Sequence, residues 1–342
     1  MPSNSPILSV QIIRLTALWA LIESGIGAYM HALEIPFTGI VLGGSAIVIL
    51  SLIAWYCQNK ASILLQSLLI VLSIKFLVSP HSPPPAYLAV AFQGLMAIVC
   101  FALPLPRVVQ ILVFFLLAMW ESAIQKFIVA TLLYGSSLWE ALDKMVASIA
   151  KDLSIHSELT THFTWTLIGT YILLYTLWAL VLWRWTLRLP ERIEREKTQI
   201  LKRISENQSN PRPLKPGKRK GSLKWIGVVF ILAFLSFSFF LEYSKEQALL
   251  KSTLSLARTL SLLIVFLYVV PPLLRKLLSR LQNRMESLPD FQAALGHQAE
   301  LRTLVPVTWQ LAKAERNWWR RYAHFMLSLL VLALYHESTD TV

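Results

Sequence analysis

Residues 108–134 read VVQILVFFLLAMWESAIQKFIVATLLY, an apolar run with one short polar interruption. It exceeds the about 20 apolar residues that a helix needs to cross a membrane. The whole chain is similar in character, because 55% of its 342 residues are hydrophobic, 15% are charged and the mean hydropathy is +0.56. A soluble domain has about 25% charged residues. The sequence therefore predicts an all-α, polytopic integral membrane protein.

Further apolar runs bring the predicted number of membrane spans to about nine. Six come before residue 188 and three after residue 224. The predicted spans are Ile7–Leu33, Phe37–Tyr56, Ala61–Val78, Ala86–Leu103, Val108–Tyr134, Phe163–Leu187, Trp225–Leu241, Leu254–Leu274 and Tyr322–Leu334.

Two basic stretches together account for the net charge of +13. Residues 188–224 contain twelve Lys and Arg against four Glu, and residues 275–321 contain nine against four acidic residues. Lys and Arg collect on the cytoplasmic side of membrane proteins. We therefore expect both stretches to face the cytoplasm of a bacterial inner membrane, where they can contact anionic lipid.

The same features predict the domain organisation. Residues 1–187 form a six-span module, 188–224 a basic cytoplasmic linker, and 225–342 a three-span module. Within the last module, 275–321 is expected to form amphipathic helices on the cytoplasmic surface. Residues 137–160 have apolar side chains at helical spacing and predict an amphipathic helix that lies in the interface or caps the six-span module.

Motifs for energy-yielding or covalent chemistry are missing from the sequence. It has no phosphate-binding G-x-x-x-x-G-K-[ST] loop, no H-E-x-x-H and no G-x-S-x-G. Cys57 and Cys100 lie in apolar runs without metal-ligand spacing, so both are interpreted as small core residues. We therefore expect a non-enzymatic chain with no cofactor, no metal and no nucleic-acid partner.

Polar residues within membrane spans are costly and are therefore the first candidates for a functional site. In Glu121-Ser122-Ala123-Ile124-Gln125-Lys126, the residues Glu121, Ser122, Gln125 and Lys126 fall on one side of a helix. They could bind a small polar ligand, with Glu121, Gln125 and Lys126 as the contacts. An internal Glu–Lys pair that faces neighbouring helices is an equal alternative.

Three further polar residues lie in other predicted spans. Glu23 in the first span is expected to form a buried hydrogen bond and is a weaker candidate for substrate contact. Gln93, followed by Gly94, could supply an amide and a close helix approach. Lys75 is expected to extend to the outer surface, because a lysine near the end of a span can place its charge in the interface.

Small residues indicate a contact surface. Ala20, Ser24 and Ala28 recur at intervals of four in the first span, and glycines open the second. Small residues at this spacing allow helices to approach closely, through docking or through internal packing.

This arrangement resembles the substrate-binding components of energy-coupling factor transporters. The resemblance rests on six spans in the first 190 residues, the turn Leu33–Gly39 (LEIPFTG), the Pro-rich loop before Ala86–Gly94 (AYLAVAFQG) and the segment before span six. It implies uptake of a vitamin-like organic molecule, driven by separate ATPase subunits, with docking on a transmembrane coupling subunit through a stripe of the A-x-x-x-A type. Here the stripe is Ala20, Ser24 and Ala28, with Ser in the middle.

The C-terminal third is similar to the coupling subunit of the same transporters. Ala312–Asn317 (AKAERN) is similar to an Ala-Arg-Gly motif, with Glu and Asn where Ala and Gly are expected. The resemblance implies that Arg316 contacts an ATPase. An equal alternative is a basic anchor in which Arg316, Arg320 and Arg321 face lipid phosphates.

Two other function classes stay open. A membrane enzyme of lipid or isoprenoid metabolism would also place polar groups inside a helix bundle, but no D-D-x-x-D-like run supports it. A non-catalytic assembly factor would depend on the surface of residues 285–321.

Overall fold

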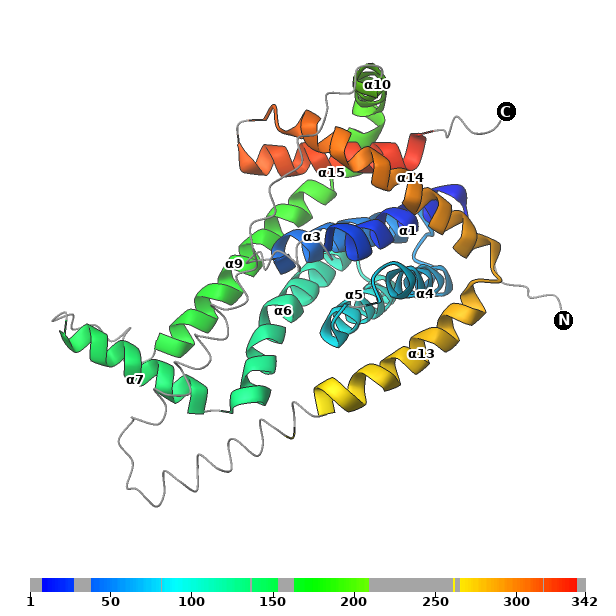
Figure 1. Cartoon of the computed structure of the whole chain (residues 1–342). Helices are drawn as coiled ribbons and strands as arrows, with labels where there is room; N and C mark the ends of the chain where they lie inside the picture. The colour runs from blue at the N-terminus through cyan, green and yellow to red at the C-terminus, as the bar shows by residue number, and fades with distance from the viewer. Residues whose placement is uncertain are drawn as a thin grey trace. The chain divides into compact units, whose positions relative to one another are not determined.

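The computed structural model describes residues 8–27, 38–80, 82–135, 137–152, 163–208, 261, 265–315 and 317–336, and all regular structure within them is helical (Figure 1). The elements are α1 (Val10–Leu21), which continues as the π-helical turn η1 (Ile22–Ile26), α3 (Thr38–Tyr56), α4 (Ala61–Val78), α5 (Pro84–Ala102), α6 (Arg107–Tyr134), α7 (Ser137–Asp152), α9 (Phe163–Thr186), α10 (Leu189–Gln208), the π-helical turn η2 (Val265–Val269), α13 (Val270–Met285), α14 (Pro289–Ala312) and α15 (Trp318–Tyr335).

Five helices of the described part are long and apolar enough to cross a membrane. Their apolar segments are Gly39–Tyr56, Ala61–Val78, Pro84–Ala102, Arg107–Leu132 and Phe163–Thr186. They match the second to sixth predicted spans within a few residues, which confirms an all-helical membrane protein.

The remaining predicted spans have different outcomes. The first corresponds to α1 with η1 and the last to α15, but neither is among the five candidate spans. α15 begins with Trp318-Trp319-Arg320-Arg321, so its first turn carries two positive charges. The predicted span at 225–241 lies outside the described residues. Of the predicted span at 254–274, the described part consists of residue 261, η2 and the first turn of α13, and residues 254–260 and 262–264 lie outside it.

The chain forms two compact units. The first contains Met1–Ile124, Ile172–Pro211 and Pro272–Val342, and the second contains Gln125–Tyr171 and Arg212–Pro271. The first unit thus joins helices from both sides of the predicted basic linker.

Helix α1 forms the centre of the first unit. It contacts α14 most extensively, and it also contacts α3, α4 and α15 (Figure 1). Leu15, Ala17, Leu18, Trp19 and Ala20 are completely buried. Apolar side chains of a helix are buried against the elements that pack on that helix. The apolar face predicted within 275–321 is therefore covered in part by α1 of the same chain.

Gly94 allows α4 and α5 to approach each other closely. A Cβ on Gly94 of α5 would lie 2.6 Å from Leu68 Cδ1 of α4. No carbon atoms can approach to that distance without displacement, so the α4–α5 contact depends on glycine at this position. The prediction that Gly94 permits a close helix approach is confirmed.

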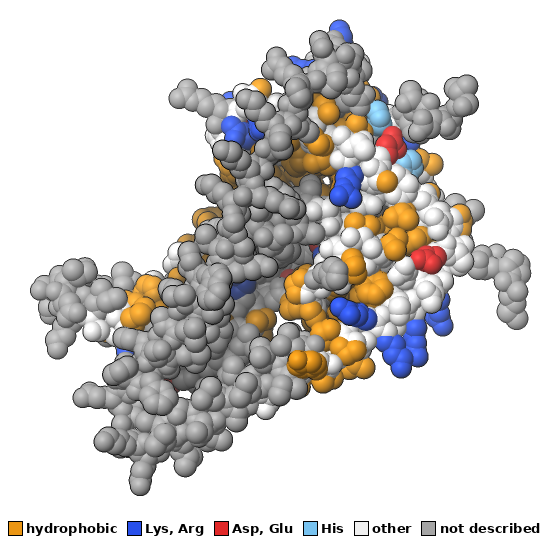
Figure 2. Space-filling view, viewed as in Figure 1, with side chains coloured by type: hydrophobic (Ala, Val, Ile, Leu, Met, Phe, Trp, Pro, Cys, Tyr) orange, Lys and Arg blue, Asp and Glu red, His pale blue; other side chains and the backbone are white. Residues whose placement is uncertain are grey.

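Helix α9 differs from α3 in its surroundings. In α3, 72% of the apolar segment is buried, whereas in α9 only 17% is buried. Leu173, Leu174 and Leu177 of α9 are exposed. Hydrophobic side chains are also exposed on the face of the molecule that Figure 2 shows. An exposed apolar surface on a helix of membrane-spanning length is expected to face lipid.

The second unit contains α7 and the adjoining parts of α6 and α9. Trp139 Nε1 donates a hydrogen bond to Thr131 Oγ1 over 2.9 Å, and Thr164 N donates to Asp143 Oδ1 over 2.7 Å. The predicted amphipathic helix is confirmed for Ser137–Asp152, which form α7. The rest of the predicted segment, 153–160, lies outside the described residues.

Candidate functional site

Two oppositely charged side chains form a buried ion pair in the first unit. Lys75 Nζ on α4 lies 2.8 Å from Glu23 Oε2 in η1, and the two side chains are only 3% and 9% exposed. The expected hydrogen bond of Glu23 is therefore present. The prediction that Lys75 extends to the outer surface is wrong, because a carboxylate inside the protein compensates its charge.

The surroundings of Lys75 hold the ion pair in place. Its Nζ lies 5.8 Å from the centre of the Tyr87 ring, whose hydroxyl donates to Ser79 O over 3.0 Å. Glu23 lies in a π-helical turn, a local geometry that is frequent at functional sites. A single acid and a single base in two apolar runs were the sequence signal, but helical spacing alone did not identify them as partners.

A second group of polar side chains meets at Gly43 of α3. Gln93 Nε2 of α5 and Ser122 Oγ of α6 each lie 3.3 Å from the position that a Cβ on Gly43 would occupy. Met119 Cε lies at the same distance. The glycine therefore gives three helices access to one point within the membrane-spanning part of the chain.

Two acceptor atoms among the predicted site residues of α5 and α6 have no hydrogen-bond donor within the described residues. These are Gln93 Oε1 and Glu121 Oε2, and both atoms are buried. A buried acceptor without a donor costs about 1–3 kcal/mol, so each of these two atoms is suited to accept a hydrogen bond from a ligand.

No protein-family model, curated protein or solved structure matches this chain. Its function must therefore be inferred from its own geometry.

Gln125 and Lys126 follow Glu121 on α6 but belong to the second unit. There, Lys126 Nζ lies 5.8 Å from the centre of the Tyr171 ring. This contact places the lysine charge over an aromatic face, which stabilises a cation in apolar surroundings. Ligand contact by Gln125 and Lys126 stays a prediction.

The small-residue stripe is covered by the chain itself. Ala20 is completely buried and Ser24 is 3% exposed. Ser24 Oγ donates to Ala20 O over 2.6 Å and accepts from Gln298 Nε2 of α14 over 3.2 Å. In this arrangement Ser24 contacts α14, and both residues are buried and present no open docking surface. Ala28 and Arg316 lie outside the described residues.

In the described part of the chain, no three His, Cys, Asp or Glu side chains are grouped so that they could hold a metal ion. The thiols of Cys57 and Cys100 are both free and buried. The polar groups near Gly43 are thus the amide of Gln93 and the hydroxyl of Ser122.

Proposed function

We propose that this chain is the substrate-binding membrane component of an ATP-driven uptake system for a small organic molecule. The observation that supports the proposal best is the pair of buried, unpartnered acceptors, Gln93 Oε1 and Glu121 Oε2. Both belong to helices of membrane-spanning length. Polar groups at this depth are retained chiefly where they bind a ligand or one another.

The chemistry of the ligand follows from these groups. Gln93 supplies both an acceptor and an amide donor, Ser122 supplies a hydroxyl, and Glu121 supplies carboxyl oxygens. A ligand with N–H or O–H donors, such as a vitamin-like heterocycle, complements two acceptors that have no donor of their own. Such a ligand gains specificity as well as affinity, because an analogue without the donors leaves the acceptors unpaired.

Separate subunits supply the energy in this proposal. The sequence contains no phosphate-binding loop, so ATP hydrolysis takes place in partner subunits. The resemblance to energy-coupling factor transporters suggests a pair of ATPases and a coupling subunit in a bacterial cytoplasmic membrane. The basic stretches 188–224 and 275–321 would then face the cytoplasm.

The covered stripe adds a condition to docking. Ala20 and Ser24 can contact a coupling subunit only after α14 separates from α1, because Gln298 of α14 is bonded to Ser24. In this proposal the six-span module therefore loses its contact with α14 and forms a contact with the coupling subunit in its place. The segment that contains Arg316 is the proposed contact for the ATPases.

The test begins with purification of the tagged full chain in mild detergent from its native membranes. Mass spectrometry then identifies the extracted small molecules and the co-purifying proteins. We expect one enriched organic metabolite and an ATPase pair. Co-purification of lipid-pathway enzymes without any ATPase would contradict the transport proposal.

Substitutions then test the site itself. Gln93→Met with Glu121→Gln should weaken retention of the metabolite at least about thirtyfold, because two hydrogen bonds are lost and each contributes about 1–2 kcal/mol. The matched control is Gln282→Met with Glu286→Gln, since these two side chains form an exposed Gln–Glu hydrogen bond on α13 and the turn after it. Equal metabolite content in both double variants would show that the site is elsewhere.

A further inference from the structure

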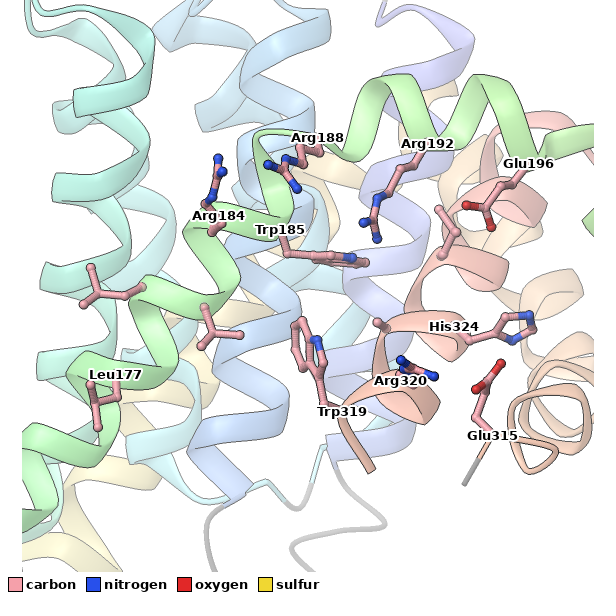
Figure 3. Close-up of a pocket in the computed structure, with 14 residues that line it drawn as sticks. Leu177, Arg184, Trp185, Arg188, Arg192, Glu196, Glu315, Trp319, Arg320 and His324 are labelled. Carbon is pink, nitrogen blue, oxygen red and sulfur yellow. The ribbon is translucent and has the colours of Figure 1, made fainter. Parts of the chain in front are cut away.

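A cavity of about 780 Å³ lies in the first unit between the end of α9, the start of α10 and the first turns of α15 (Figure 3). One wall is a stripe of side chains that recur at intervals of three or four along α9 and into α10. The stripe runs Leu177, Val181, Arg184, Arg188 and Arg192.

The stripe changes from apolar to basic along its length. Leu177 and Val181 are exposed and belong to the candidate membrane span Phe163–Thr186. Arg188 and Arg192 lie beyond the end of that span. The cavity thus extends from the hydrocarbon region into the interfacial region, and only an amphiphilic ligand matches both ends.

The basic end has more positive than negative charge. It contains Arg184, Arg188, Arg192 and Arg320 against two carboxylates, Glu196 and Glu315. Among the described residues, none of the four arginines makes an ion pair with a carboxylate. Figure 3 shows the Arg192 side chain pointing from α10 towards the indole of Trp185.

Two other polar groups at the cavity lack partners within the described residues. Trp185 is only 6% exposed, yet its indole Nε1 has no hydrogen-bond acceptor. Nδ1 of His324 is likewise buried without a partner. Trp185 is held by an edge-to-face contact with Trp319 at a ring-centre distance of 6.2 Å. A buried indole N–H normally has an acceptor, so a ligand oxygen would satisfy it.

We propose that this cavity binds a phosphate-bearing amphiphile. Its anionic headgroup contacts Arg192, Arg320 and Trp185 Nε1, and its hydrocarbon chain lies along Leu177 and Val181. The planar guanidinium group of arginine matches the oxygens of a phosphate in two parallel hydrogen bonds. The proposal goes beyond substrate uptake, because the cavity shares no residue with the polar group at Gly43.

The first experiment is native mass spectrometry of the purified full chain with added lipids. One phosphatidic acid molecule should stay bound under conditions that remove phosphatidylcholine. Arg192→Gln with Arg320→Gln should weaken phosphatidic acid binding at least about tenfold. The matched control is Arg280→Gln with Arg284→Gln, which removes two exposed arginines from α13, outside the cavity.

Two results of this experiment would overturn the proposal. Equal weakening by both double variants would mean that diffuse positive charge attracts the lipid without a defined site. Equal retention of phosphatidylcholine, whose headgroup has no net charge, and phosphatidic acid would mean that the negative charge of the headgroup plays no part in binding.

A second experiment distinguishes a lipid from a free anion. Val181→Trp fills the apolar end and keeps all four arginines, so it should abolish binding of phosphatidic acid and leave binding of inorganic phosphate unchanged. Tight binding of inorganic phosphate together with unchanged lipid binding in this variant would overturn the amphiphile assignment. Because Val181 is exposed on α9, this variant also stays informative if the double arginine variant does not fold.

Discussion

Lys75 Nζ lies 2.8 Å from Glu23 Oε2, with both side chains buried between α1, η1 and α4. The two residues are 52 positions apart and come from separate apolar runs. A buried charge is tolerated only when a partner of opposite charge lies beside it. The ion pair therefore fixes which faces of η1 and α4 meet.

Removal of one member of this pair should be strongly destabilising. We expect Lys75→Met or Glu23→Leu to lower the free energy of unfolding by about 3–5 kcal/mol, because the remaining charge is left unpaired. The variant Glu23→Leu with Lys75→Met should lose much less, since no charge remains. Denaturant unfolding in detergent measures all three, and additive losses would contradict a direct pair.

The contact between α4 and α5 predicts a different effect. Gly94→Ala should lower the free energy of unfolding by about 1–3 kcal/mol, because the new Cβ would lie 2.6 Å from Leu68 Cδ1. The loss caused by Gly94→Ala should be smaller when it is measured in a Leu68→Ala background, because the Leu68 methyl groups are then absent. Gly296→Ala is the control, since nothing lies within 4 Å of its Cβ position on α14. There we expect a gain of about 0.5–1 kcal/mol.

The Ser24–Gln298 hydrogen bond allows the α1–α14 contact to be fixed covalently. In a chain with Cys57→Ala and Cys100→Ala, Ser24→Cys and Gln298→Cys should be linked in high yield by a short bifunctional thiol reagent.

The linked protein then tests the docking condition. It should no longer co-purify with ATPase subunits, because α14 cannot separate from Ser24. Each single cysteine variant treated with the same reagent serves as the control. Unchanged co-purification of the linked protein would show that partners dock elsewhere.

A pH effect is expected at the contact between α10 and α15. Glu194 accepts hydrogen bonds from Lys197 and from the Tyr335 hydroxyl, and these bonds lower the pKa of its carboxyl below the ordinary value of 4.5. Burial and the bond to Glu194 raise the pKa of Tyr335. Because the folded-state pKa of Glu194 is depressed, its stabilising effect is present above about pH 4.5 and is lost as the pH falls through the folded-state pKa.

Thermal unfolding at several pH values tests this expectation. Glu194→Gln should unfold at a slightly lower temperature than the unmodified chain near neutral pH and at the same temperature in strong acid. The difference is small because Glu194 is exposed. The control is Glu191→Gln on the same helix, which should show no such difference. A difference that grows in acid would contradict the assignment.

Sequence patterns located the membrane helices well. The predicted span Ala61–Val78 has the same bounds as α4, and the predicted span Phe163–Leu187 ends one residue after α9. Apolar length determines these helices, because every backbone polar group in lipid must be bonded within the helix. The same patterns did not predict which helix faces meet, as the wrong expectation for Lys75 shows.

The sequence by itself determined that this chain is helical, membrane-embedded and basic outside its spans, since these properties follow from run length, composition and the positions of Lys and Arg. Only the tertiary structure decided that Lys75 neutralises Glu23, that α14 covers Ser24, and that Arg192 and Arg320 line one cavity. Each of these contacts joins residues that are far apart in the chain. Helical periodicity gives the face on which a residue lies, but side-chain packing selects the face that it meets.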